Sequence, residues 1–287
     1  MTATPLLPIL LLLQAPKAPP SDAAELRSVN VVVTDDKGAP VEGLGLEDVA
    51  LLENGLARDV STLVLDRRPL TMILLVDTSQ ATSSFYRLNM LDPVVGFLKR
   101  LPEGTEYALW TTGDRPTKLV DFTSDAGEAS RALMRVAPQG GNTMLDALVE
   151  ASAELKKKEA ERTAVVAVSA IGIEFSSRNR YQVTDEVPKN TDLVLAVQID
   201  EGETDADSRF VYDYVFSELA KRTGGLHETV LSSLGIESSI KKLVAYLRGG
   251  YRLSYATLPG IKNRKLEVKV ARPGVKVRLG QSRAEGS

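Results

Sequence analysis

The sequence predicts an α/β protein with a doubly wound, mostly parallel sheet, helices on both faces, and a small antiparallel β subdomain formed by both chain ends. Three observations predict this fold. The aliphatic run Ile73–Val76 suits a strand that is buried on both faces. From Thr71 to Leu247, apolar strands alternate with amphipathic helices, which is typical of a parallel sheet. Both chain ends carry strands in which apolar and polar residues alternate, which is typical of antiparallel sheets with one solvent-exposed face.

The first 24 residues predict a signal-like segment and a linker. Leu6–Leu13 is an apolar run, interrupted only by Pro8, that is too short to cross a bilayer. Small residues and prolines follow at 14–20, as in the cleavage region of a secretory signal. We therefore expect export to the periplasm or the cell exterior. No Lys or Arg precedes the run, so a disordered apolar tail is the alternative. No other segment suits a membrane span.

Residues 25–68 predict an N-terminal β segment. Strands are expected at 29–34, 49–53 and 58–65. The first ends at a turn closed by Gly38, and Asn54-Gly55 is a hairpin signal after the second.

Residues 69–249 predict the α/β domain. Helix starts are marked by Asp92, which precedes a proline, and by Ser124, while Gly224-Gly225 marks a helix end. The expected strands are 72–76, 106–111, 163–168 and 193–199, and the expected helices are 92–101, 125–136, 144–158, 210–223 and 236–247.

Residues 250–283 predict a C-terminal β segment with strands at 251–255, 265–271 and 275–279. We expect these strands to pack with residues 25–68, so that the α/β domain is an insertion between the two ends of one β subdomain.

Composition excludes several classes of function. The formal net charge is −3 and no dense basic patch occurs, so we expect no nucleic-acid partner. The chain has no cysteine, which excludes disulfides, thiolate metal sites and cysteine nucleophiles.

Polar residues follow the buried strand at 72–76 directly. Asp77 and Ser79 would therefore lie at the carboxyl edge of the sheet, where open α/β folds bind ligands. Their oxygens are of the kind that magnesium prefers. The alternative is that both residues cap the helix that follows.

Together these segments resemble a von Willebrand factor A domain, which has a Rossmann-like fold, and more closely the bacterial von Willebrand A-related proteins that carry flanking β segments. The resemblance covers most of the chain after the linker. Its most specific part is Val31–Val49, which is similar to the family opening VxVTDxxGxPVxGLxxxDF. The other matching segments are Glu53-Asn54-Gly55, 69–70 with 75–79, 121–125, 140–143 with 146–148, 220–225 and 251–278.

The resemblance implies a metal-ion-dependent adhesion site, built from an Asp-x-Ser-x-Ser loop, a threonine from a second loop and an aspartate from a third. Such a site leaves one cation position open for a partner's carboxylate. Asp77 and Ser79 match the first loop. Ala81 stands in place of the second serine, with Thr82 beside it, and Ala170 stands in place of the distant aspartate.

Two residues correspond to the threonine of the second loop. Asn142 falls at its position, with Thr143 just beyond; either could instead cap the helix that begins at Met144. The resemblance thus implies a degenerate metal site made of Asp77, Ser79, Asn142 and Thr143, with no cofactor or with weakly bound Mg or Mn.

The function expected from these residues is that of a non-catalytic protein-interaction module with a decayed cation site and an unknown protein partner. The alternative is a working Mg- or Mn-dependent adhesion domain that binds a partner's carboxylate. An enzyme is not expected, because His227 is the single histidine and no G-x-S-x-G or nucleotide-binding glycine motif occurs. Residues 176–181 are a candidate partner contact, and Asp200–Asp207 is expected to be a solvated acidic loop.

Overall fold

The computed structural model describes residues 25–202 and 206–285, so the signal-like segment predicted at 1–24 lies outside the described residues. The chain divides into two compact units. Residues 67–247 form the α/β unit. The described residues of the two chain ends, 25–66 and 248–285, form the β unit.

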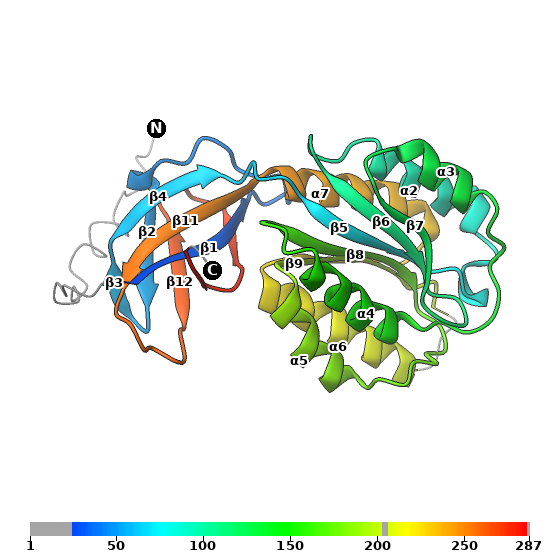
Figure 1. The fold of residues 1–287 in the computed structure, drawn as a ribbon. Helices are drawn as coiled ribbons and strands as arrows, with labels where there is room; N and C mark the ends of the chain where they lie inside the picture. Colours follow the sequence, from blue (N-terminus) through cyan, green and yellow to red (C-terminus); the bar gives the residue numbers. More distant parts are fainter. Residues whose placement is uncertain (1–24, 203–205, 286–287) are drawn as a thin grey trace. The chain divides into compact units, whose positions relative to one another are not determined.

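A six-stranded sheet forms the centre of the α/β unit (Figure 1). Its strand order is β10-β9-β8-β5-β6-β7, and every neighbouring pair is parallel except β6 and β7. All residues of β5, β8 and β9 are buried, as expected for a sheet covered on both faces. The bounds are β5 (Thr71–Val76), β6 (Glu106–Thr111), β7 (Thr117–Thr123), β8 (Thr163–Ala170), β9 (Leu193–Ile199) and β10 (Leu226–Val230).

Helices cover both faces of this sheet, with α4, α5 and α6 on one face and α2, α3 and α7 on the other (Figure 1). Ile73 and Leu75 pack on the first face against Leu148 of α4 and Phe216 of α6. The predicted α/β class is confirmed. The helices are α2 (Leu91–Leu98), α3 (Ala126–Leu133), α4 (Met144–Lys157), α5 (Arg180–Asn190), α6 (Ala206–Thr223) and α7 (Ile236–Arg248). Among the described residues, no helix combines the length and apolarity needed to cross a membrane.

Two predicted helix starts are wrong. A π-helical turn, Tyr86–Met90, runs directly into α2, so Asp92 lies inside the first turn and does not cap it. Asp125, one residue after the predicted Ser124, caps α3 by accepting a hydrogen bond from the Gly127 N–H. Strands β7 and β10 and helix α5 were not predicted, because their sequences are largely polar and lack a clear apolar period.

The β unit contains two antiparallel sheets. The larger sheet has the order β13-β1-β11-β4, and β14 also pairs with β1. Strands β1 and β11 are antiparallel, with Val31 opposite Tyr251. The smaller has the order β12-β2-β3. Strands from the two chain ends therefore pair in both sheets. The bounds are β1 (Glu25–Thr34), β2 (Val49–Glu53), β3 (Leu56–Arg58), β4 (Val60–Leu65), β11 (Gly250–Thr257), β12 (Leu266–Val270), β13 (Lys276–Leu279) and β14 (Arg283–Ala284).

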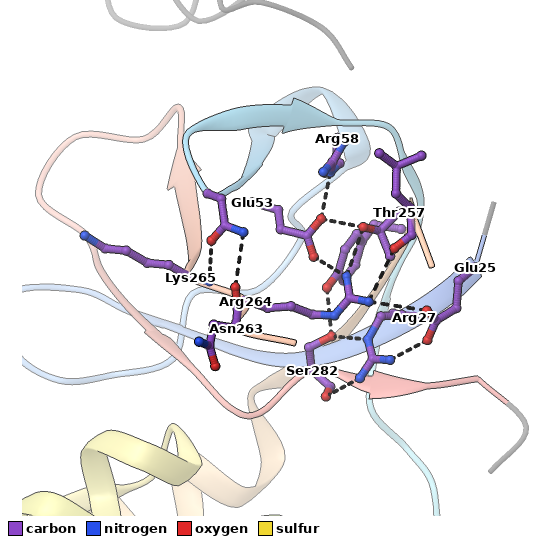
Figure 2. A network of polar contacts seen from close by, with 12 residues as sticks. Glu25, Arg27, Glu53, Arg58, Thr257, Asn263, Arg264, Lys265 and Ser282 are labelled. Atoms are coloured by element: carbon purple, nitrogen blue, oxygen red, sulfur yellow. Dashed lines mark hydrogen bonds and ion pairs between the residues drawn. The ribbon is translucent and has the colours of Figure 1, made fainter. Parts of the chain in front are cut away.

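A buried carboxylate, that of Glu53 at the end of β2, forms the centre of a polar network in the β unit (Figure 2). Arg58 Nε donates to Glu53 Oε2 at 2.8 Å, and Arg264 Nη1 donates to Oε1 at 2.5 Å. The Thr257 hydroxyl also donates to Oε2. Burial raises the pKa of Glu53, but hydrogen bonds from Thr257, Arg264 and Arg58 outweigh burial, so the pKa is lowered overall.

Candidate functional site

The candidate site lies where β5 and β8 end, at the carboxyl edge of the sheet. Asp77 and Ser79 follow β5, and Ala170 is the last residue of β8. Asn142 and Thr143 precede α4 and are both buried. The structure thus brings the sequence-predicted residues together in one buried cluster.

The Asp77 carboxylate is fully buried and faces hydrogen-bond donors. Oδ1 accepts the Ser79 N–H at 2.8 Å. Oδ2 accepts the Ala170 N–H at 2.9 Å, the Asn142 amide Nδ2 at 2.9 Å and the Ser169 hydroxyl at 3.2 Å. Burial raises the pKa of Asp77 above its ordinary value, although the hydrogen bonds from Ser79, Ala170 and Ser169 oppose this rise.

The Asn142 side chain presents its nitrogen, not its oxygen, to Asp77. Nδ2 also donates to Ser169 Oγ at 3.0 Å, and the amide oxygen accepts the Thr112 hydroxyl at 2.6 Å. This orientation suits an ionised Asp77, since an ionised carboxylate only accepts hydrogen bonds and the reverse would place the amide oxygen against it. The predicted oxygen ligand at this position is therefore directed away from Asp77.

The remaining hydroxyls of the predicted site have different surroundings. Thr143 occupies the N-cap position of α4, but its hydroxyl donates to the Thr112 carbonyl at 2.9 Å. The Thr82 hydroxyl donates to the Ser79 carbonyl at 2.9 Å. Ser79 Oγ is buried and makes no hydrogen bond of normal geometry with any described residue. The Ser79 hydroxyl is nevertheless close enough to Asp77 to lower the pKa of that carboxyl.

Glu174 supplies a second carboxyl group near Asp77 that the sequence did not indicate. Its Oε1 accepts the Ser176 N–H at 2.9 Å. Its buried Oε2 makes no hydrogen bond of normal geometry with a described residue, but the Tyr212 hydroxyl is close enough to Glu174 to oppose the rise of its pKa. Burial raises the pKa of Glu174, and the negative charge of Asp77 adds to the rise. Glu174 lies in an irregular loop outside any motif, so no sequence pattern could have identified it.

An arginine enclosed by aromatic rings lies at the start of α5. The Arg180 guanidinium carbon is 4.6 Å from the Tyr181 ring centroid, 5.1 Å from that of Phe210 and 5.8 Å from that of Tyr214. A cation at a helix N-terminus is disfavoured by the helix dipole, and contacts with aromatic faces offset that cost. Tyr181 and Phe210 are 59% and 55% exposed, which is unusual for rings in a packed cluster. We call these four residues the aromatic patch; it includes one end of the predicted contact segment 176–181.

The single histidine is part of a hydrogen-bonded chain between β9, β10 and α6. His227 Nδ1 lies 3.1 Å from Ser217 Oγ, and Nε2 lies 3.0 Å from Gln198 Oε1. Gln198 in turn donates to Asp213. Ser217 lies inside α6, where backbone N–H groups are used in the helix, so the helix offers Ser217 no oxyanion donors.

The acidic loop after β9 is described in part. Asp200 forms an ion pair with Arg209 of α6 at 2.8 Å, and Glu201 accepts the Ser233 N–H at 2.9 Å. Residues 203–205 lie outside the described residues. Within the described residues, no three His, Cys, Asp or Glu side chains converge as a metal cluster.

Comparison with known proteins assigns the α/β unit. Residues 72–170 match the family model of the von Willebrand factor type A domain. This segment of the α/β unit belongs to the von Willebrand factor type A family. No curated protein matches the chain.

Solved structures share the fold of this domain at low identity. The SpRpn10 VWA domain is 17% identical, with a TM-score of 0.50 over 63% of this chain and 97% of that one. A von Willebrand factor type A protein from Catenulispora acidiphila is 11% identical, with a TM-score of 0.53. The alignment covers 92% of this chain and 74% of that one. Proximal thread matrix protein 1 from the mussel byssus, with a zinc-occupied MIDAS motif, is 16% identical, with a TM-score of 0.52 over 69% and 50%. This chain thus spans about half the length of the mussel protein.

Domains of this kind are protein-interaction modules, and some hold a metal ion. The residues at the ligand positions that the resemblance implies differ from that pattern in three respects. Ala81 and Ala170 carry no ligand atom, Asn142 directs a donor at Asp77, and the Ala170 N–H occupies one Asp77 lone pair.

Proposed function

We propose that this chain is a non-catalytic protein-interaction module whose cation site has decayed, and which contacts its partner through the aromatic patch. The observation that carries the proposal is the exposed cluster around Arg180. Tyr and Arg are enriched at the energetic centres of protein interfaces, where large rings bury much area at low entropic cost. The patch lies on α5 and α6, and needs no metal ion to bind a partner.

The surroundings of Asp77 support the second half of the proposal. An adhesion-site aspartate would share its oxygens with a cation, but Oδ2 of Asp77 already accepts three hydrogen bonds. These donors satisfy a buried carboxylate, for which a missing partner would be costly.

A second candidate function is the Mg- or Mn-dependent adhesion domain. Two observations favour it: Ser79 Oγ and Glu174 Oε2 are both buried and make no hydrogen bond of normal geometry with a described residue. Glu174 could then compensate for the aspartate that Ala170 replaces.

Affinity capture from an extract of the source organism separates the two functions. We expect the chain to retain the same partner in EDTA and in Mg, and to lose it in the Phe210→Ser variant. Leu88→Ser is the matched control, since Leu88 is 80% exposed in the same unit but lies outside the patch. Capture that needs Mg and survives Phe210→Ser would contradict the proposal and favour the adhesion domain.

We further propose that the protein is exported and of bacterial type, and that residues 69–249 are inserted into a β subdomain made of 25–68 and 250–283. Export rests on the apolar run at 6–13 and the small residues that follow it. Cell fractionation with N-terminal sequencing tests it, and a full-length N-terminus in the cytoplasm would contradict it. Soluble, cooperative folding of residues 67–247 alone tests the insertion.

A further inference from the structure

Three loops meet at Asp77, and one amide side chain links them. We propose that the Asn142 carboxamide has taken the place of the cation in this chain, so that a permanent hydrogen-bonded link holds the loops in one arrangement without metal. The inference deepens the proposed function, because it gives the physical reason why the site no longer needs an ion.

The contacts of Asn142 reach every element of the site. Its Nδ2 donates to Asp77 after β5 at 2.9 Å and to Ser169 in β8 at 3.0 Å, and its Oδ1 accepts the Thr112 hydroxyl after β6 at 2.6 Å. Its backbone N–H donates to Ile173 at 3.3 Å, and its carbonyl accepts the Phe175 N–H at 2.7 Å. Asn142 is 1% exposed, so water does not compete for these bonds.

The chemistry of the amide makes this role specific to asparagine. A cation would bind Asp77 and pull neighbouring oxygens toward itself, whereas Nδ2 offers two N–H donors to the same oxygens. Aspartate has the same shape but no donor when ionised. Asn142→Asp would therefore place two carboxylates together in a buried site, where each needs a positive charge nearby. Ser79 Oγ, which is buried close to Asp77, would provide a further oxygen ligand.

The test is thermal unfolding of the purified chain, and of variants, in Mn²⁺ and in EDTA, followed by Trp110 fluorescence. The unsubstituted chain should unfold at one temperature in both conditions. Asn142→Asp should unfold earlier in EDTA, and Mn²⁺ should raise its midpoint by at least about 5 °C. Asn142→Ala should lower the midpoint equally in both, since it removes the link without adding a charge.

Asn179→Asp is the matched control. Asn179 caps α5 by accepting hydrogen bonds from Tyr181 and Gln182, a role that aspartate fills equally well, so neither stability nor its response to Mn²⁺ should change. If Asn142→Asp does not fold in EDTA, the variant is instead refolded from urea in the presence and in the absence of Mn²⁺. We expect it to recover native Trp110 fluorescence only when Mn²⁺ is present.

Three results would overturn the inference. A metal-dependent midpoint in the unsubstituted chain that Asp77→Ala abolishes would place an ion at the site. An Asn142→Ala variant as stable as the parent would show that the link carries no stability. An Asn142→Asp variant that Mn²⁺ neither stabilises nor refolds would show that the amide does not occupy a cation's place. Because no partner is present, the last two results leave metal-free partner capture, and with it the proposed function, intact.

Discussion

The two units each bury one carboxylate completely, and they stabilise it in opposite ways. In the β unit, Glu53 lies between two arginines and its pKa is lowered. In the α/β unit, Asp77 is surrounded by neutral donors, namely two backbone N–H groups, an amide and a hydroxyl, and its pKa is raised. Hydrogen bonds alone therefore satisfy the geometry of a buried carboxylate without fully compensating its lost hydration.

The difference shows which cluster is committed to structure. Glu53 ties β2 to β3 through Arg58, and to the segment before β12 through Arg264, so it joins strands that are distant in sequence (Figure 2). Asp77 lies at the carboxyl edge of the sheet, where open α/β folds place ligands, and Ser79 Oγ and Glu174 Oε2, near it, make no hydrogen bond of normal geometry with a described residue. The β unit uses its charge to hold strands together, whereas in the α/β unit the buried carboxylate lies at the candidate site.

The largest effect is expected for Glu53→Ala. Removing this carboxylate leaves Arg58 and Arg264 without their buried partner, and breaking a buried ion pair costs about 3–5 kcal/mol of unfolding free energy. Hydrogen exchange should show lost protection in β2 and β12. If β2 and β12 were as protected in the variant as in the parent, the two arginines would have found other partners. That result would contradict the contrast drawn between Glu53 and Asp77.

A smaller loss is expected for Asp77→Ala. Four donors lose their acceptor, and we expect a cost of about 3 kcal/mol, because unsatisfied buried groups each cost 1–3 kcal/mol and some can rearrange. Trp110, the single tryptophan, reports urea unfolding of the α/β unit. The loss should be the same in Mn²⁺ and in EDTA; a loss seen only with Mn²⁺ would indicate that Asp77 binds an ion.

As the pH falls, Glu53 and Asp77 should change the free energy of unfolding in opposite directions. The pKa of Glu53 is lower in the folded state than its ordinary value of 4.5, so its stabilising effect is complete above that pH and is lost as pH falls through the folded value. The pKa of Asp77 is raised on folding, so protonation in its range favours the native state. Urea unfolding from about pH 5 to about pH 3 should show a shallower acid loss in Glu53→Gln than in the parent. Equal slopes would contradict this assignment.

The smallest effect is expected for Ser79→Ala. Its hydroxyl makes no hydrogen bond of normal geometry with any described residue, so its removal should change the unfolding free energy by less than about 1 kcal/mol. The backbone N–H to Asp77 is retained. Partner capture should be unaffected, whereas a working cation site would lose a ligand and bind its partner more weakly.

The α/β fold could be predicted because its signals are local. The uninterrupted apolar strands at 72–76 and 163–168 and the apolar stripe of the helix from Met144 mark buried elements directly. Strand β10 and helix α5 were missed because tertiary packing, not an apolar period, holds these polar segments in place.

The candidate site could be placed but not described from the sequence. Asp77 was located by its position after a buried strand, and Asn142 by the resemblance to the family. The sequence could not show that Asn142 would direct nitrogen at Asp77, since this depends on Thr112, thirty positions earlier. Glu174 and the aromatic patch depend on loop and helix packing, which no motif encodes.

The most direct measurement of the central claim is the side-chain amide signal of Asn142 in a ¹⁵N–¹H spectrum of the deuterated chain, assigned by its absence in Asn142→Asp. A buried amide that donates to Asp77 and Ser169 should exchange slowly with water. Its signal, and that of the Ala170 N–H, should remain sharp when Mn²⁺ is added. Selective broadening of both signals by Mn²⁺ would place the ion beside Asp77 and would contradict the replacement of the cation by an amide.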